Sequence, residues 1–116
     1  MITDLTAAEI GRRLAARELS ATEVAQAFLD RIDRTDSSIG SFLLIDREGA
    51  LEASERAQRL IDRGEAGPLT GVPIALKDNL STEGIETTCA SKILKGYIPP
   101  FDATVVRRCK EAGMVV

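Results

Sequence analysis

The pattern of apolar residues changes at Gly67-Pro68, and this change limits the folds open to the chain. Before this point, apolar side chains recur every three or four residues, which is typical of amphipathic helices. After it, residues 72–76 form a short, continuous apolar run that ends at Lys77, which is typical of a buried strand. Helices followed by strands and a further helix predict an α/β fold. We therefore divide the chain into a helical region, residues 1–66, and the start of a core, residues 67–116.

Two capping boxes predict where the first helices begin. Each box places a hydroxyl at the start of a helix and a carboxylate three residues later, so that free backbone N–H groups are satisfied. The first box is formed by Thr6 and Glu9, and the second by Ser20 and Glu23. The polar residues 35–38 predict the end of the second helix.

The remaining elements follow from shorter patterns. Residues 41–46 predict a short strand, and a third helix is predicted from Glu48 to Arg63. Residues 80–101 are loop-like, and a connection of this length in a compact domain is often functional. Asp102 is predicted to cap a last helix, which Gly113 ends before a strand begins at residues 114–116. A strand that has just begun predicts that the chain is a truncated piece of a larger sheet.

Composition excludes several classes of function. The net charge is −3, so the chain lacks the clustered basic charge of a nucleic-acid footprint. It contains no histidine, which excludes histidine metal sites and Ser-His catalysis within the chain. No segment reads as a membrane span or a secretory signal, so we expect a cytoplasmic location. We expect Cys89 and Cys109 to be reduced and packed as small apolar side chains.

Lys77 is the candidate catalytic residue. A lysine at the end of an apolar strand is partly desolvated, and desolvation lowers the pKa of a lysine toward that of a useful base. A lysine base can activate a serine without any histidine. The alternative is an ion pair that holds a strand end, and from the chemistry alone it is the commoner role. Asp78 is a poor partner for such a pair, because neighbouring strand residues point to opposite faces.

The segment around Lys77 resembles the lysine segment of the amidase-signature family. Residues 68–79 read PLTGVPIALKDN, which is similar to the family pattern PLxG[IV]P[IV]x[IVL]KD[NL]. Two further blocks, residues 87–94 and 99–106, read TTCASKIL and PPFDATVV. These blocks resemble, within the family, the A subunits of aspartyl/glutamyl-tRNA amidotransferases. The resemblance covers essentially the whole chain and implies a mixed-sheet amidase fold.

The resemblance implies a Ser–cis-Ser–Lys triad in which Lys77 is the catalytic lysine. Both serines of the family lie in a Gly/Ser-rich stretch that this chain lacks, so the chain alone is expected to be inactive. Asn79, Thr87, Thr88 and Ser91 are expected to bind substrate or to support the lysine, although loop hydrogen bonding is the alternative role for each. No metal site is expected.

The resemblance also implies partners. The complete protein would hydrolyse glutamine and pass ammonia to a partner subunit, which activates a misacylated Glu-tRNA(Gln) or Asp-tRNA(Asn) with ATP and Mg²⁺. The B and C subunits of a heterotrimer would be its partners, with tRNA contacted through the complex. This chain itself is expected to bind no cofactor. Two alternatives stay open: a part of another amidase-signature amidohydrolase, or a non-catalytic helical module that binds a partner.

Overall fold

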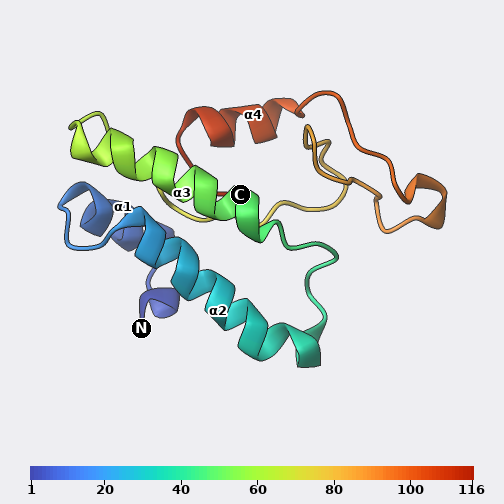
Figure 1. Cartoon of the computed structure of the whole chain (residues 1–116), viewed down its shortest axis with the longest axis horizontal. Helices are drawn as coiled ribbons and strands as arrows, with labels where there is room; N and C mark the ends of the chain where they lie inside the picture. The colour runs from blue at the N-terminus through green and yellow to red at the C-terminus, as the bar shows by residue number, and fades with distance from the viewer.

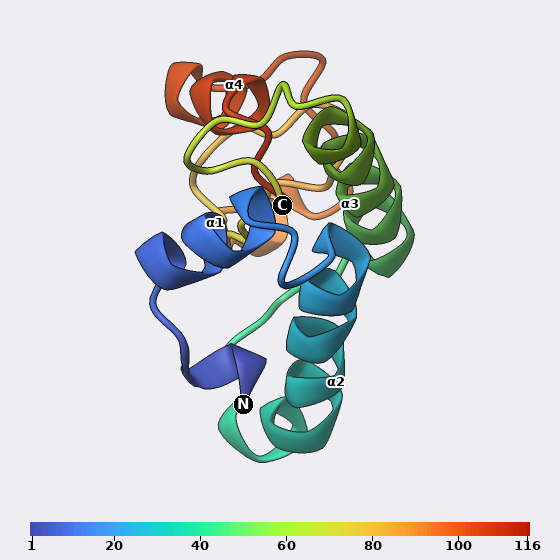
Figure 2. The same cartoon turned by 90° about the vertical axis from the view of Figure 1, so that its left-hand side faces the viewer.

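The computed structural model describes all 116 residues and is built from helices and loops. In chain order the elements are η1 Ile2–Asp4, α1 Ala7–Ala15, α2 Ala21–Ile39, α3 Arg47–Asp62, η2 Lys92–Leu94 and α4 Thr104–Glu111. α2 and α3 lie side by side, and α4 lies at the opposite end of the molecule from the last turn of α2 (Figures 1 and 2).

Both predicted helix starts are confirmed. The Thr6 side chain accepts a hydrogen bond from the Glu9 backbone N–H at 3.2 Å. At the start of α2, the Ser20 hydroxyl accepts from the Glu23 N–H, and the Glu23 carboxylate accepts from the Ser20 N–H, so the capping box is complete. The first box is only half formed, because the Glu9 carboxylate bonds to Arg12 and Arg13 instead.

The predicted end of the second helix at residues 35–38 is wrong, because α2 continues to Ile39. The polar side chains are accommodated within the helix. The Thr35 hydroxyl donates to the Arg31 carbonyl at 2.8 Å, and the Ser38 hydroxyl donates to the Thr35 carbonyl at 2.8 Å. α2 ends where Gly40 adopts a left-handed conformation with φ of 69°, which glycine adopts without steric cost.

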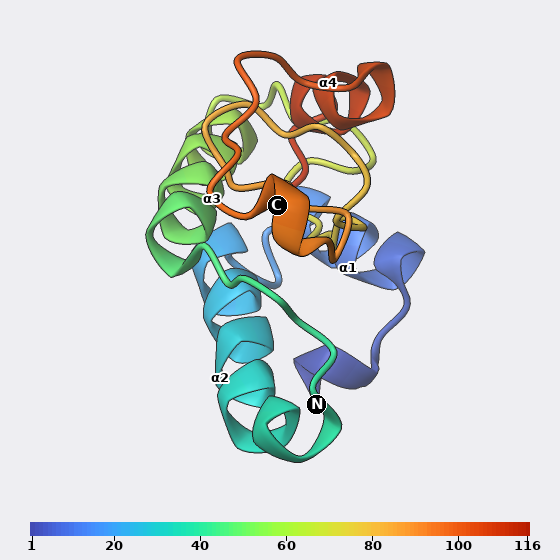
Figure 3. The ribbon, with the colours of Figure 1, turned by 90° about the vertical axis from the view of Figure 1, so that its right-hand side faces the viewer.

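The predicted strand at residues 41–46 is also wrong. This segment is a mostly exposed connection that leads from the end of α2 back to α3 (Figure 3). Its last residue, Asp46, is the N-cap of α3 and accepts a hydrogen bond from the Gly49 N–H at 3.0 Å. The apolar run has the length of a strand, but no neighbouring strand is present for it to pair with. The prediction for α3 is confirmed, because the helix begins and ends within one residue of its predicted bounds.

The three N-terminal helices share one core with the lysine segment. Buried side chains from α1, α2 and α3 pack around Val72, which is 1% exposed; they are Ile10, Leu14, Ala21, Val24, Ala57 and Ile61. A hydrogen bond between α2 and α3 supports this packing, because the Gln58 side chain of α3 accepts from the Ala21 N–H of α2 at 2.7 Å. The core therefore anchors the segment that carries Lys77, and the boundary expected at residue 67 stays a prediction.

Gly11 allows α1 to approach the chain at Pro68, and Gly11→Ala is expected to destabilise the fold. A Cβ at this position would lie 2.2 Å from the Pro68 carbonyl oxygen. Alanine normally stabilises a helix interior by about 1 kcal/mol relative to glycine, but overpacking costs roughly 1–3 kcal/mol. Because a backbone carbonyl cannot rotate away, the collision should outweigh the helix gain, and urea unfolding should show a net loss of up to about 2 kcal/mol.

Gly40→Ala is the control for this prediction. Gly40 has open space around its Cα, so alanine there meets only the conformational cost of a left-handed residue, roughly 1–2 kcal/mol. Gly40→Ala should therefore destabilise the chain without disturbing the packing of α1, and the exchange rate of the Val72 amide should stay the same. Gly11→Ala should disturb that packing and make the Val72 amide exchange faster. A Gly11→Ala chain that is more stable than the parent would contradict the close approach.

The predicted mixed sheet is not seen in this chain, which has no strand and one isolated parallel bridge. Residues 71–74 and 113–115 run parallel, joined by hydrogen bonds from Gly71 N to Gly113 O at 2.8 Å, Val115 N to Val72 O at 3.0 Å, and Ile74 N to Val115 O at 2.8 Å. Pro73 faces Val115 in the bridge. A regular ladder needs consecutive rungs, and the short segment that follows α4 supplies only one. Ile74 and Leu76 are therefore half-buried and Ala75 is exposed, rather than covered on both faces.

The last predicted helix is confirmed, but its predicted cap is not. α4 follows Ala103, which makes no side-chain cap, and Gly113 follows the helix with φ of 79°. The Asp102 carboxylate instead accepts from the Glu83 N–H at 2.7 Å and from the Lys110 ammonium at 2.8 Å. Burial raises the pKa of Asp102, but the hydrogen bonds from Lys110 and Glu83 outweigh burial and lower it. Asp102 thus ties the long loop to α4.

Candidate active site

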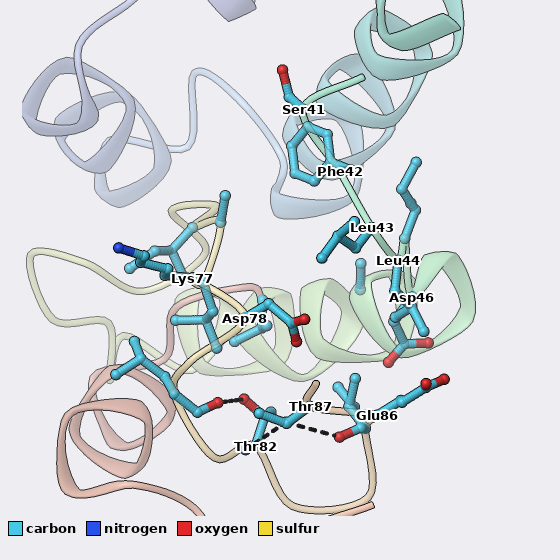
Figure 4. Close-up of a pocket in the computed structure, with 18 of the residues that line it drawn as sticks. Ser41, Phe42, Leu43, Leu44, Asp46, Lys77, Asp78, Thr82, Glu86 and Thr87 are labelled. Carbon is cyan, nitrogen blue, oxygen red and sulfur yellow. Dashed lines mark hydrogen bonds between the residues drawn. The ribbon is translucent and has the colours of Figure 1, made fainter. Parts of the chain in front are cut away.

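A groove of about 780 Å³ opens along the lysine segment. Five parts of the chain line it: the middle of α2, the 41–46 connection, Ala50 of α3, residues 73–80 with the following loop, and Val115-Val116. Most of the lining is apolar, and the polar side chains gather where residues 73–76 end. In the view of Figure 4, Asp78 lies between Lys77 and the pair Leu43 and Leu44, and the Lys77 ammonium points away from these leucines.

Lys77 is one of the residues that line the groove, and its ammonium group makes no ion pair. The residue is exposed, and none of the ion pairs in the chain includes it. The alternative of a lysine paired with an acid at a strand end is thus not seen. The sequence also predicted that Lys77 would be partly shielded from water at the end of a buried strand. This shielding is not seen, because Lys77 is exposed and the residues before it, Leu76 and Ala75, are half-buried and exposed. This chain places the lysine on the groove wall without covering it.

Asn79 and Thr87 line the same groove but differ in their surroundings. Asn79 is exposed, so its amide can contact a molecule in the groove. Thr87 is 5% exposed, and its hydroxyl donates to the Ile85 carbonyl at 3.2 Å while accepting from the Thr82 N–H at 3.4 Å. Thr87 therefore holds the loop together, which is the loop hydrogen bonding named as the alternative for it.

Thr88 and Ser91 lie outside the large groove and line an adjoining cavity of about 280 Å³. Ser91 is the N-cap of η2, where its hydroxyl accepts from the Ile93 N–H at 3.3 Å. Thr88 donates hydrogen bonds to Asp78 from both its hydroxyl and its N–H. The structure thus brings Lys77, Asn79 and Thr87 together in one groove, and it separates Thr88 and Ser91 from them.

Asp78 is the residue that sequence reasoning missed. The sequence suggests it only as a poor partner for Lys77, and its carboxylate instead accepts hydrogen bonds from Thr88 and Ala90. The hydroxyl of Thr88 lowers the pKa of the Asp78 carboxyl most, its N–H adds to this, burial opposes them, and the Ala90 N–H also lowers it. No periodic pattern links residues ten and twelve positions apart in a loop, so no local signal could have found this contact.

The expected burial of Cys89 is wrong. Cys89 is exposed and lies in a left-handed backbone conformation with φ of 52°. The turn that holds it curls around Asp78, which leaves the thiol on the groove wall instead of in a core. Cys109, on α4, is half-buried.

The arrangement places a lysine on the groove wall without a serine beside it. A free lysine amine on the wall of an apolar groove can accept a proton from a hydroxyl that enters the groove. The one serine in the groove lining is Ser41, which is exposed and comes from the connection after α2. Figure 4 shows it apart from Lys77, and no hydrogen bond joins the two residues.

No helix of the chain combines the length and the apolar character that crossing a membrane requires.

Comparison with known proteins identifies close relatives along the whole chain. The profile of the family described as Amidase matches residues 23–116. The chain is 56% identical over 97% of its length to the A subunit of the glutamyl-tRNA(Gln) amidotransferase of Cutibacterium acnes, and 52% identical over 96% of its length to that of Carboxydothermus hydrogenoformans. The protein of the same name from Streptomyces coelicolor is 52% identical over 99% of the chain. In each case the chain spans about a quarter of the relative, 23% of its length.

Solved structures share the fold. Two structures, one with an inhibitor bound, come from work on a vestigial protein complex and the evolutionary origins of an s-triazine catabolic enzyme. Each superimposes with a TM-score of 0.91 at 33% identity, over 96% of this chain and 25% of the other. The helices, the bridged lysine segment and the loop that follows it are therefore an amidase-like arrangement. Because the family profile covers most of the chain and these relatives match nearly all of it, the chain belongs to the amidase family.

Proposed function

We propose that the chain forms the N-terminal part of the glutamine-hydrolysing subunit of a tRNA-dependent amidotransferase. In this proposal, glutamine supplies ammonia for converting Glu-tRNA(Gln) or Asp-tRNA(Asn) into the correctly amidated product. The observation that carries the proposal is the 56% identity, over 97% of the chain, to a protein named for this activity. The B and C subunits, tRNA contacted through them, ATP used by the partner subunit and a cytoplasmic location belong to the same proposal.

Lys77 is the base in this proposed reaction. Its ammonium group has no carboxylate partner and the residue lines the groove, so in this proposal its neutral amine takes a proton from a serine hydroxyl. That serine would activate the nucleophilic serine, which attacks the glutamine amide and releases ammonia. Both serines come, in this proposal, from the part of such a protein that lies beyond the matched region. Asn79, exposed on the same wall, is positioned to contact the substrate or the serine pair.

The apolar groove supports the proposal that a larger core covers this site. Leu43, Leu44 and Ile45 are 70%, 48% and 40% exposed on one side, and the half-buried Ile74 and Leu76 lie on the other. Exposed apolar surface of this extent marks a place where other protein packs. The chain spans 23% of the length of the Cutibacterium acnes relative, so the remaining core of such a protein is the proposed covering. Covering the groove would also remove water from the lysine, which favours its neutral form.

A chimeric enzyme tests the proposed function. The 116 residues would replace the aligned 113 residues of the Cutibacterium acnes relative, co-produced with the partner subunits of that organism. Release of ammonia from glutamine should stay within about tenfold of the parent, since a loss of that size is about 1.4 kcal/mol of transition-state stabilisation. A chimera that folds and assembles but hydrolyses no glutamine would contradict the proposal.

A second candidate function is an amidase acting on another small amide. It is favoured by the solved structures associated with s-triazine catabolism, which share the fold at 33% identity. The residues that distinguish one amide substrate from another are then expected outside the matched region, so the same lysine segment could serve either reaction. A panel of small amides assayed beside glutamine in the chimera separates the two candidates. The helical-module alternative is less well supported, because much of the apolar surface of α1, α2 and α3 is occupied by their own core around Val72.

A further inference from the structure

The turn after residue 87 is built around one residue, Asp78. Its side chain accepts from the Thr88 N–H at 3.0 Å, from the Ala90 N–H at 3.3 Å and from the Thr88 hydroxyl. Its main-chain carbonyl accepts from the Cys89 N–H at 2.7 Å. Four donors from three consecutive residues thus converge on a single residue ten positions earlier, which is an unusual concentration for a loop.

The backbone of this turn is strained. Cys89 and Ala90 both have left-handed conformations, with φ of 52° and 56°, and neither is a glycine. A non-glycine residue in this region is strained, and such a conformation persists only where its surroundings hold it. Successive N–H groups in a turn can form a concave site for an anion. The Asp78 carboxylate fills this concavity and so supplies the interactions that hold the strained turn.

The same contacts turn the Asp78 carboxylate away from Lys77. Figure 4 shows the Lys77 ammonium and the Asp78 carboxylate pointing in different directions from adjacent residues. None of the ion pairs in the chain includes Asp78. Cys89 and Ala90, which the carboxylate holds in place, line the groove that contains Lys77.

We propose that Asp78 is a positioning residue with two effects on the lysine site. It holds the turn of residues 88–90 as a wall of the groove, and it keeps its own carboxylate engaged so that no ion pair forms with Lys77. The first effect is a property of this chain by itself. The second matters for catalysis only through the proposed function, because an ion pair would favour the ammonium form and oppose a lysine base.

The pH dependence of the turn follows from the hydrogen bonds to the charged carboxylate. They hold the pKa of Asp78 below its ordinary value, so the contacts are fully present above that ordinary value, near pH 4, and are lost as the pH falls through the lowered pKa. The charged groups that share a cavity with Asp78 are Asp46, Lys77, Glu86, Lys92 and Lys95, and none of them is paired with it. The turn is therefore expected to open at acidic pH independently of the helices.

Nuclear magnetic resonance of the 116-residue chain tests the first effect. The carboxyl carbon of Asp78 and the amides of Thr88 and Ala90 should titrate with one common midpoint below about 3.9, the ordinary aspartate value. In Asp78→Ala, amide exchange at residues 88–90 should accelerate at least tenfold while exchange within α2 is unchanged. Glu83→Gln, an exposed carboxylate whose side chain accepts none of the chain's hydrogen bonds, is the control and should leave the turn protected. Unchanged protection in Asp78→Ala, or separate midpoints, would overturn the proposal.

The pH–rate profile of the chimeric enzyme tests the second effect. Thr88→Val removes one donor to Asp78, so the carboxylate gains freedom to approach Lys77, and the acid limb of kcat/KM should move up by about one pH unit. The double variant Thr88→Val with Asp78→Asn has no carboxylate that could pair with Lys77. Its acid limb of kcat/KM should return toward the parent position, although the turn of residues 88–90 stays disturbed. A Thr88→Val profile without a shift, in an active chimera, overturns the second effect. An inactive parent chimera refutes the proposed function instead, and the resonance experiment still decides the role of Asp78.

Discussion

Lys77→Ala in the chimeric enzyme is expected to lower kcat/KM for glutamine by roughly 10²–10⁴-fold, the usual contribution of a general base. The physical reason is that the chain provides no other base at this place. It has no histidine, and the acidic residue beside the lysine is occupied by Thr88 and Ala90. Steady-state ammonia release measures the loss, and kcat should fall at least as much as kcat/KM if the lysine acts in the chemical step.

Two matched variants define what this loss means. Lys77→Arg keeps the positive charge but cannot lose its proton near neutral pH, so it should be about as inactive as Lys77→Ala if the lysine is a base. If the charge alone were needed, Lys77→Arg would retain most of the activity, and the assignment of a base would be wrong. Lys95→Ala removes an exposed lysine outside the large groove and should leave the rate unchanged. The 116-residue chain alone is expected to show no turnover.

Leu14→Ala is expected to lower the free energy of unfolding by roughly 2–5 kcal/mol. Leu14 is 0% exposed and lies in the cluster that joins α1, α2 and α3 to Val72. Truncating it removes buried methyl groups and leaves a cavity that the closely packed neighbours Gly71 and Ala21 cannot easily fill. Urea unfolding of the 116-residue chain measures the change, with the slope expected to stay the same.

The position of Leu14 links this stability to the candidate site. Because Val72 belongs to the same cluster, the loss should reach the bridge at Pro73 and speed exchange of the Val115 amide, which bonds to the Val72 carbonyl. Leu43→Ala is the control, since Leu43 is 70% exposed and its loss should change stability by less than about 0.5 kcal/mol. Equal effects of the two substitutions would show that the helices do not support the lysine segment in the way described.

Local patterns were sufficient for the helices. The hydroxyl–carboxylate pairs at Thr6 and Ser20 predicted the starts of α1 and α2 because a cap is an interaction within one turn. Errors arose where a pattern had two readings. The polar residues 35–38 could end a helix or bond to its own carbonyls, and residues 41–46 could form a strand or an exposed connection.

Local patterns were not sufficient for the walls of the groove. The Asp78 contacts with Thr88 and Ala90 join residues ten and twelve positions apart through a loop without periodicity. The contacts of Asp102 with Glu83 and Lys110 are similar, and they replaced a helix cap that was locally plausible. Such hydrogen bonds depend on where the loop returns in space, which packing decides.

The sequence by itself determined the family, the helix starts and the place of Lys77 at the end of an apolar run, because each is written in residues that are close neighbours in the chain. Only the tertiary structure decided that Asp78 faces the turn rather than the lysine, and that Lys77 stands exposed on a groove wall. The reason is physical: the solvation and the pairing of a charged side chain depend on the groups that surround it in space, and in this chain those groups come from segments far apart in the sequence.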